Sequence, residues 1–432
     1  MSRAAAGALL ASLLAGACIA APASALPADA LAAQATPVRI APTADDDFAD
    51  LAPFGGAVGS ARIVALDEQT HGGHEEFVLK TRLLRYLHER LGFDVLVLES
   101  GFFDVGRLQQ ARQAGGKVDD LAPDNIFYMY SKSAEGRALL QYVDSTQATA
   151  HPLVLAGMDS QHTGALSQQE LVPQLAAFLQ ARGSALPKQP DWAGFAATVR
   201  DMLALKEEKS SSDESAFLAM SDAILRELDG TRPARGSSIA RDLVDLPPPH
   251  DGAVSTVGSA GWWTRVVTDL QAQNTQLRAP QSRARDHAMG DNVAWIADHL
   301  VPGQRLVLWG HAIHLMHDAP GPDAPPFAGT VIRRHFGADY HVAHLTGLAG
   351  RYLDYGSLQP RDIPPAAPGS LEARLAATPG DALYLPPAKG APADAPPARF
   401  IDYTPFGTLP GRGVNWESTF FIRRLTPVTM VR

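Results

Sequence analysis

The sequence predicts an α/β protein with a mostly parallel central sheet flanked by helices and a helical insertion or cap. The apolar runs Arg62–Asp67 and Phe93–Glu99 enclose a helical pattern at His74–Leu91. A strand–helix–strand unit of this kind pairs its strands in parallel and needs cover on both faces of the sheet. The same alternation recurs downstream, and a long helical stretch between the later strands supplies the insertion.

The elements follow in order from hydrophobic periodicity and turn residues. In the first helix, apolar residues recur on one face, and Gly92 supplies a stop. The same criteria predict one further helix and four further strands, at Ala134–Thr146, Pro152–Gly157, Arg305–Gly310, Tyr340–Thr346 and Ser418–Arg423. Two segments rich in proline, glycine or serine are predicted loops, Asp245–Gly261 and Pro386–Pro397.

Length and composition suit one large domain. The chain has 432 residues, of which 46% are hydrophobic, so it can bury a sizeable core. We expect a single domain over residues 51–432, with the helical insertion at about 165–300. The formal net charge of -9 argues against nucleic acid as the main partner. Beyond the N-terminus, no stretch is long and apolar enough to suggest stable membrane insertion.

The N-terminus has the pattern of a secretory signal peptide over residues 1–25. Arg3 precedes an apolar segment rich in small residues, and Ala23-Ser24-Ala25 fits the small-x-small cleavage pattern. We therefore expect export to the periplasm or the medium, in preference to lipoprotein anchoring at Cys18. Because Cys18 is the only cysteine, the mature chain would have no thiol chemistry. Residues 26–50, rich in alanine, proline and aspartate, are predicted to form a loose N-terminal segment.

Candidate functional residues gather where predicted strands end. The run Leu66–Glu75 carries Glu68, His71 and His74 on a strand-to-helix turn. Another buried strand runs directly into three histidines, His311, His314 and His317. Since parallel strands place their carboxyl ends at one edge of the sheet, we expect both groups to form one site.

The residue types in this cluster favour hydrolysis by activated water. A carboxylate three residues before an imidazole, as in Glu68 and His71, can fix the tautomer of the ring and raise its basicity. Glu99 ends the neighbouring predicted strand and should reach the same edge. The sequence contains no G-x-S-x-G nucleophile elbow, so a serine mechanism of the α/β-hydrolase kind is not expected.

Four motifs resemble the erythromycin esterase family, in the family's order. They are the turn DEQTHGGHE at Asp67–Glu75, the strand from Gly92 to Glu99, the helix segment RARDHAMGDN at Arg283–Asn292, and WGHAIH at Trp309–His314. The segment Gly157–Gln161 also matches a family strand end. The resemblance covers about residues 55–350.

The resemblance implies hydrolysis of an ester or lactone without a covalent intermediate, a cofactor or an obligatory metal. His71 would be the general base, and Glu68 and Glu99 would orient it or the water. His314, with or without His311, would polarise the carbonyl or stabilise the oxyanion. Four further residues are expected to contact the substrate: Lys80, His74, Arg285 and Asp286. A macrolide is one candidate substrate, with antibiotic resistance as the consequence.

This chain departs from the family pattern at three positions. Asp67 replaces a glycine, Ala312 replaces an asparagine, and Lys80 replaces an arginine, which loses the planar fork of the guanidinium. The residues expected to carry out hydrolysis are retained, whereas positions that shape substrate binding differ from the family pattern. The sequence therefore supports a hydrolase site more firmly than a macrolide esterase.

Two alternatives remain open on sequence grounds. The spacings His71-x-x-His74-Glu75 and His311-x-x-His314-x-x-His317 could converge on a metal, as in a metallohydrolase. A non-enzymatic protein that binds haem or metal on the same scaffold is the second. Trp309 and the Phe102–Phe103 pair are expected in the core, or lining an apolar pocket. The substrate and the oligomeric state cannot be read from the sequence.

Overall fold

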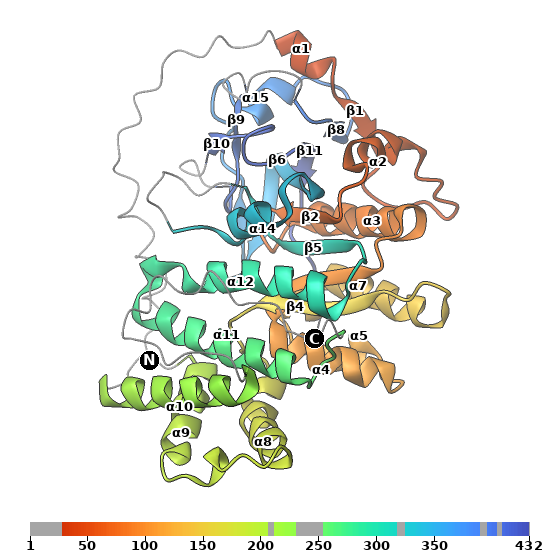
Figure 1. Cartoon of the computed structure of the whole chain (residues 1–432). Coiled ribbons are helices and arrows are strands. Elements are labelled where there is room, and N and C mark those ends of the chain that lie inside the picture. The colour runs from red at the N-terminus through yellow and green to blue at the C-terminus, as the bar shows by residue number, and fades with distance from the viewer. Residues whose placement is uncertain are drawn as a thin grey trace.

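One mixed sheet organises the residues that the computed structural model describes, which are 28–205, 211–229, 254–317, 325–388, 395–403 and 408–431. The predicted signal peptide, including Cys18, lies outside these residues, as do parts of the two predicted loops. Figure 1 shows the order of the elements along the chain. The strands of the sheet are β1 (Thr36–Val38), β2 (Ile63–Glu68), β3 (Val95–Gly101), β4 (Val154–Asp159), β5 (Leu306–His311), β6 (Tyr340–Asp354), β7 (Gln359–Asp362), β8 (Ala382–Leu385) and β11 (Ser418–Leu425).

The strand order is β1-β8-β11-β6-β2-β5-β3-β4, with β7 beside β6. The six strands from β11 to β4 in that order run parallel, whereas β8 and β7 pair antiparallel to their neighbours. A separate pair, β9 (Pro397–Arg399) and β10 (Thr408–Pro410), is antiparallel. The predicted fold class, a mostly parallel sheet flanked by helices, is confirmed.

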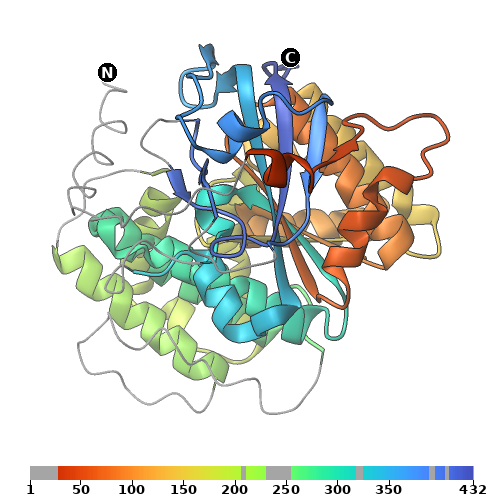
Figure 2. The same cartoon turned by 90° about the horizontal axis from the view of Figure 1, so that it is seen from above.

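Alternating side chains of the central strands enter two separate cores. In β2, Ile63 and Ala65 pack into one core, while Val64 and Leu66 pack into the other. This alternation follows from the two-residue period of a strand, and burial on both faces explains the continuously apolar sequences. Figure 2 shows helices on both sides of the strands.

The two helical layers come from different parts of the chain. The layer that meets Val64 and Leu66 includes α2 (Ala52–Val58), α3 (His74–Leu91) and α7 (Ala134–Ser145). The opposite layer includes α8 (Ala165–Ala181), α9 (Trp192–Leu203), α10 (Ser211–Asp229), α11 (Ala260–Arg278), α12 (Ala284–Trp295) and α14 (Ala328–Phe336). The remaining helices are α1 (Ala28–Ala32), α4 (Phe102–Gln113), α5 (Val118–Leu121), α6 (Tyr128–Ser131), α13 (Ala312–Leu315) and α15 (Leu371–Leu375). The described part of the region predicted as an insertion, about 165–300, is indeed largely helical.

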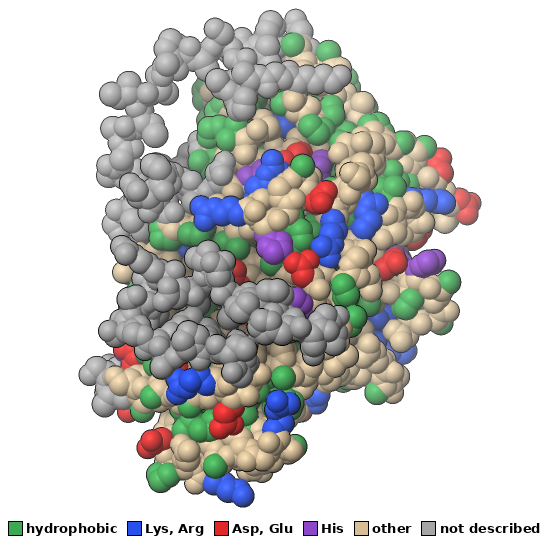
Figure 3. Space-filling model, viewed as in Figure 1, with side chains coloured by type: hydrophobic (Ala, Val, Ile, Leu, Met, Phe, Trp, Pro, Cys, Tyr) green, Lys and Arg blue, Asp and Glu red, His purple; other side chains and the backbone are tan. Residues whose placement is uncertain are grey.

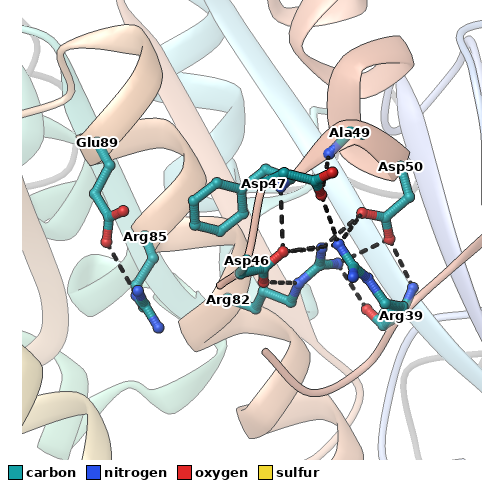
Figure 4. Close-up of polar contacts among 9 residues, drawn as sticks. Arg39, Asp46, Asp47, Ala49, Asp50, Arg82, Arg85 and Glu89 are labelled. Atoms are coloured by element: carbon teal, nitrogen blue, oxygen red, sulfur yellow. Dashed lines mark hydrogen bonds and ion pairs between the residues drawn. The ribbon is translucent and has the colours of Figure 1, made fainter. Parts of the chain in front are cut away.

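The prediction of a loose segment over residues 26–50 is wrong for its described part. β1 joins the sheet by pairing with β8. Residues 39–50 are also bound to α3, because the buried Arg82 guanidinium donates to the carboxylates of Asp46 and Asp50 (Figure 4). The alanine- and aspartate-rich composition suggested a loose segment, but Asp46 and Asp50 bind the guanidinium of Arg82, which is remote in sequence.

β6 and β3 both end later in the sequence than predicted, because of the strands that pair with them. β6 continues from Thr346 to Asp354, because β11 pairs with it as far as Gly350 and β7 pairs with its last four residues. β3 continues past Glu99 to Gly101, which pairs with the last residue of β4. The extension of β6 depends on the remote strand β11 and on the neighbouring strand β7, and the extension of β3 depends on β4.

The surface shows no single dominant charge on the face drawn in Figure 3, where acidic and basic side chains are interspersed. Within the described part of the chain, no helix combines the length and apolarity that a membrane crossing needs.

We predict that Arg82→Ala lowers the free energy of unfolding by about 3 kcal/mol, because it leaves two carboxylates without their buried cation. Urea unfolding of the chain from residue 26 measures this. Arg85→Ala is the matched control one turn later in the same helix, since Arg85 forms a partly exposed pair with Glu89 (Figure 4). The control should lose only about 0.5 kcal/mol. Equal losses in the two variants would contradict the prediction.

Candidate active site

The register of the parallel strands brings the predicted catalytic residues together. Glu68, the last residue of β2, lies opposite His311, the last residue of β5. On the other side of β5, Trp309 pairs with Leu98, so Glu99 emerges at the same level. Gly310 permits this approach, since a Cβ at that position would lie 3.0 Å from a Glu99 carboxylate oxygen. The structure thus brings Glu68, Glu99 and His311 together at this edge of the sheet.

Glu68 and His71 form a buried carboxylate–imidazole pair. Oε1 of Glu68 lies 2.7 Å from Nδ1 of His71 and also accepts a hydrogen bond from the Tyr130 hydroxyl at 3.2 Å. The ammonium of Lys80 donates to the other oxygen. Burial would raise the pKa of Glu68, but the charges of Lys80 and His71 outweigh it and lower that pKa. The carboxylate therefore stays ionised, and it holds the proton of His71 on Nδ1, which leaves the lone pair on Nε2.

The turn that carries His71 is held by its own backbone. The carbonyl of Gly72 accepts hydrogen bonds from the N–H groups of Leu353 and Val428, both at 3.0 Å. A Cβ on Gly72 would lie 1.8 Å from the Leu353 carbonyl oxygen, so only glycine permits this approach. The close approach of β6 therefore explains why position 72 of the motif is glycine. The bond to Val428 also connects this turn to the C-terminal segment.

Aromatic rings surround the imidazole of His71. The ring centroid lies 4.7 Å from that of Phe127, 5.2 Å from that of Tyr355 and 5.2 Å from that of His311. Tyr355 comes from the turn between β6 and β7 and is 38% exposed, so it forms part of the surface above the base. His71 itself is only 6% exposed.

Glu99 lies at the centre of the cluster. One oxygen accepts the backbone N–H of His311 at 2.7 Å. The other lies 3.3 Å from the Arg285 guanidinium and 3.4 Å from Nε2 of His314. Burial opposes ionisation of Glu99, but the charges of His314, His71 and Arg285 outweigh it and lower its pKa to about 2. Glu99 is therefore an anion that gathers cationic groups from other elements.

The N-terminal turn of α12 supplies the two residues predicted from the family helix motif. Asp286 accepts from Nδ1 of His314 at 2.6 Å, which repeats the carboxylate–imidazole arrangement of His71. Arg285 donates to both oxygens of Asp159, at 2.9 and 2.6 Å. Asp159 ends β4 and was not assigned a role from sequence, although its strand-end position within the matched segment Gly157–Gln161 was a usable signal. The predicted site residues Arg285, Asp286, His314 and Glu99 thus form one network.

His311 contacts the protein through both ring nitrogens. Nδ1 accepts the N–H of Ile313 at 3.1 Å and so caps the short helix α13. Nε2 lies 3.7 Å from a carboxylate oxygen of Asp402, which belongs to the segment between β9 and β10. No pattern in the sequence singled out Asp402, because it follows a proline-rich stretch and lies in no regular element.

Two residues predicted to contact the substrate lie elsewhere. Lys80 is fully buried beneath Glu68, with its ammonium 4.1 Å from the ring centroid of Trp309, so it supports the site from below. His74 turns away from the cluster and pairs with Glu135 at 2.6 Å. Lys80 was named because it stands at a family arginine position, and His74 because it lies in the motif of His71, but α3 directs both side chains to other partners.

The imidazoles named for the metal alternative also diverge. His71 pairs with Glu68, His74 with Glu135, His314 with Asp286, and His317 with Glu417 at 2.8 Å. Among the described residues, no three histidine, cysteine, aspartate or glutamate side chains are placed to hold a metal ion.

Trp309, Phe102 and Phe103 are core residues, with exposures of 0–2%. Phe102 does border a cavity of about 300 Å³, which it shares with Val257, Trp262 and the first half of β4. That cavity contains no cluster of titratable groups and is lined by the early residues of β4, whereas the active-site cluster adjoins the last one, Asp159.

A sequence model of the erythromycin esterase family matches residues 88–404, which include Glu99, Asp159, His311, His314 and Asp402. The chain belongs to the erythromycin esterase family. This membership supports a hydrolase. Glu68 and His71 lie before the matched range, so their assignment rests on the motif and on the geometry above.

Similar proteins agree with this family assignment. The YbfO protein of Bacillus subtilis (strain 168) is 24% identical over 343 residues, which cover 75% of this chain and 74% of that protein. Erythromycin esterase type II of Escherichia coli is 28% identical over 120 residues, which cover 28% of each.

Solved structures with the same fold include a Bacillus cereus protein, a succinoglycan biosynthesis protein, and a mutant erythromycin esterase, EreC, in its open conformation. The Bacillus cereus protein gives a TM-score of 0.72 at 21% identity, with 94% of this chain and 98% of that chain covered. The succinoglycan biosynthesis protein gives 0.70 at 19% identity, with 93% and 97% covered. The esterase gives 0.63 at 16% identity, with 91% and 98% covered. At these identities the likeness establishes the fold alone.

We predict an acid-dependent stability from Glu99. Its pKa falls from an ordinary 4.5 to about 2, so the ionised group contributes about 3 kcal/mol to the free energy of unfolding above pH 4.5. That contribution is lost as the pH falls from 4.5 towards 2. Glu99→Gln lacks this charge, so its free energy of unfolding has no contribution from Glu99 ionisation. The difference in free energy of unfolding between wild type and Glu99→Gln should therefore shrink as the pH falls from 4.5 towards 2.

Urea unfolding at several pH values measures this difference. Glu89→Gln serves as the control, because Glu89 forms a partly exposed pair with Arg85 and its loss should change stability little at any pH. A difference between wild type and Glu99→Gln that stays constant from pH 6 to pH 3 would contradict the prediction.

Proposed function

We propose that the protein is an exported hydrolase that cleaves an ester or lactone with a water molecule activated by His71, without a covalent intermediate. The observation that carries this proposal is the buried Glu68–His71 pair, in which Nδ1 lies 2.7 Å from the carboxylate. It leaves Nε2 as the basic nitrogen at the carboxyl edge of the sheet. Membership of the erythromycin esterase family supports ester hydrolysis. Export is supported by the signal-peptide pattern at residues 1–25.

The proposed reaction has two proton transfers. Nε2 of His71 takes a proton from water as the oxygen attacks the carbonyl carbon, which forms a tetrahedral oxyanion. When that intermediate collapses, the bond to the alkoxide leaving group breaks, and the imidazolium returns the proton to it. The products are a carboxylic acid and an alcohol, and Glu68 stabilises the transient imidazolium throughout.

Arg285 and His314 are the proposed oxyanion partners. Arg285 is one-quarter exposed and already compensates Glu99 and Asp159. Its Nη1 lies 3.5 Å from Nε2 of His314, so the two groups face the same point. Donors fixed before the reaction stabilise developing negative charge without reorganisation, which is the main source of rate in acyl transfer.

The surroundings of His71 support a substrate with an apolar part. The half-buried Phe127 and the exposed Tyr355 border the His71 ring, and the half-buried Tyr128 packs against Phe127. A macrolide belongs in the first substrate panel because the relative from Escherichia coli is named erythromycin esterase type II. Macrolide hydrolysis would make antibiotic resistance a consequence.

We predict that His71→Ala lowers kcat/KM for any hydrolysed ester by about 10²–10⁴-fold, since the general base is lost. The chain from residue 26 is incubated with a panel of esters and lactones that includes erythromycin, with and without a chelator. Mass spectrometry detects the gain of one water. His335→Ala is the control, because His335 is a half-exposed histidine paired with Asp298 at the molecular surface.

The outcomes separate the competing hypotheses. Turnover that needs His71, persists in the control and is unaffected by chelator supports the proposal. Turnover abolished by chelator would instead favour the metallohydrolase. A wild-type protein that hydrolyses nothing in the panel would remove the proposed function and make binding of haem or metal the next question.

A further inference from the structure

The segment around Asp402 has an unusual backbone conformation. Asp402 has φ 41° and Tyr403 has φ 52°, so two consecutive residues other than glycine occupy the left-handed region. Each such residue costs of the order of 1 kcal/mol or more, and such conformations persist only where surrounding contacts enforce them. They are concentrated at functional sites, which makes this pair a reason to ask what the segment does.

Hydrogen bonds bind this segment to the turn that carries His71. The backbone N–H of Asp402 donates to the carbonyl of Gln69 at 2.7 Å. The hydroxyl of Tyr403 donates to the buried Glu76 at 2.6 Å, and Glu76 also accepts the N–H of Gln69. On the other side, Tyr352 donates to the carbonyl of Asp402 at 3.1 Å. These contacts hold the strained backbone against Gln69, which lies two residues before the proposed base, His71.

The result is a carboxylate aimed at His311. One oxygen of Asp402 is buried without a hydrogen-bond partner and lies 3.7 Å from Nε2 of the ring. Since the N–H of Ile313 occupies the lone pair on Nδ1, the neutral ring carries its proton on Nε2, facing Asp402. An unpartnered buried oxygen is costly, so a partner in reach is expected to use it.

We propose that Asp402 is a positioning residue of the active site, whose carboxylate keeps a proton on Nε2 of His311 and so sets the tautomer and charge of that ring. His71, His311 and His314 would then each have a dedicated carboxylate: Glu68, Asp402 and Asp286. The placement rests on geometry alone, whereas its effect on catalysis rests on the proposed function.

The charges around His311 agree with this role for Asp402. Burial disfavours a charged His311, but Asp402, Glu99 and Glu68 outweigh burial and raise its pKa to about 9. His71 is the other titratable ring that faces it, at 5.2 Å. The cap at Nδ1 opposes full protonation, because an imidazolium has no lone pair to accept the N–H of Ile313. Removal of the Asp402 charge should therefore shift the balance towards the neutral ring.

The experiment compares wild type with Asp402→Asn by NMR. Asparagine tolerates positive φ almost as readily as glycine, so this substitution removes the charge and keeps the backbone. The chain from residue 26 is labelled with ¹⁵N-histidine, and His311 is assigned by comparison with His311→Gln. Asp362→Asn is the matched control, since its carboxylate is 84% exposed and pairs only with the exposed Arg351.

We predict that the titration midpoint of His311 falls by about one pH unit or more in Asp402→Asn and stays unchanged in the control. A change below about 0.3 pH unit in a folded variant overturns the proposal. If Asp402→Asn does not fold, Asp402→Gly decides on the same criterion, because glycine relieves the strain and also removes the carboxylate.

A kinetic measurement separates this proposal from the proposed function. For any ester that wild type hydrolyses, Asp402→Asn should lower kcat, and the alkaline limb of the pH profile should move down with the His311 midpoint. If Asp402→Asn lowers kcat but leaves the alkaline limb of the pH profile unchanged, the proposal that Asp402 sets the charge of His311 is overturned. If wild type hydrolyses no ester, the proposed function fails, while the NMR titration still decides the role of Asp402.

Discussion

The ion pair between Glu68 and Lys80 is the interaction on which the candidate site depends. Glu68 ends the central strand β2, and its fully buried carboxylate would be unstable without a cation. Lys80 supplies that cation from the second turn of α3, and its ammonium also lies over Trp309 of β5. This one buried pair therefore connects two strands and a helix. Because Lys80 binds Oε2 of Glu68, Oε1 is left for His71. Lysine suits this geometry, because His71 and Tyr130 occupy Oε1 of Glu68 and leave only Oε2 for the cation, so the two-oxygen contact of a guanidinium fork is not available.

The rest of the site repeats this logic with other partners. Buried carboxylates at strand ends need positive charge or N–H donors, and the helices and loops that cover the edge deliver them. Glu99 receives the backbone N–H of His311, the Arg285 guanidinium and the His314 ring. Asp159 receives Arg285. The same contacts that satisfy the carboxylates also orient the imidazoles, so stability and chemistry are parts of one hydrogen-bond network.

The sequence predicted the parts of this structure that depend on local pattern. Parallel strands with buried faces, the helix beginning at His74, and functional residues at strand ends all follow from periodicity and from the rule for parallel sheets. The burial of Lys80 could not be predicted in this way, since it depends on where α3 packs. Asp402 was missed because its position is fixed by contacts with Gln69 and Tyr352, which lie 333 and 50 residues away along the chain. The order in residues 28–50 was missed for the same reason, as Arg82 supplies the stabilising charge.

The contact between Gly72 and Val428 has a consequence for biosynthesis. The turn that carries His71 is bound by a residue near the end of the sequence, and β11 completes the sheet beside β6. A growing chain therefore contains His71 long before Val428, whose N–H binds the turn that carries it, has been made. The backbone around His71 reaches its folded position only after β11 and Val428 have joined the structure.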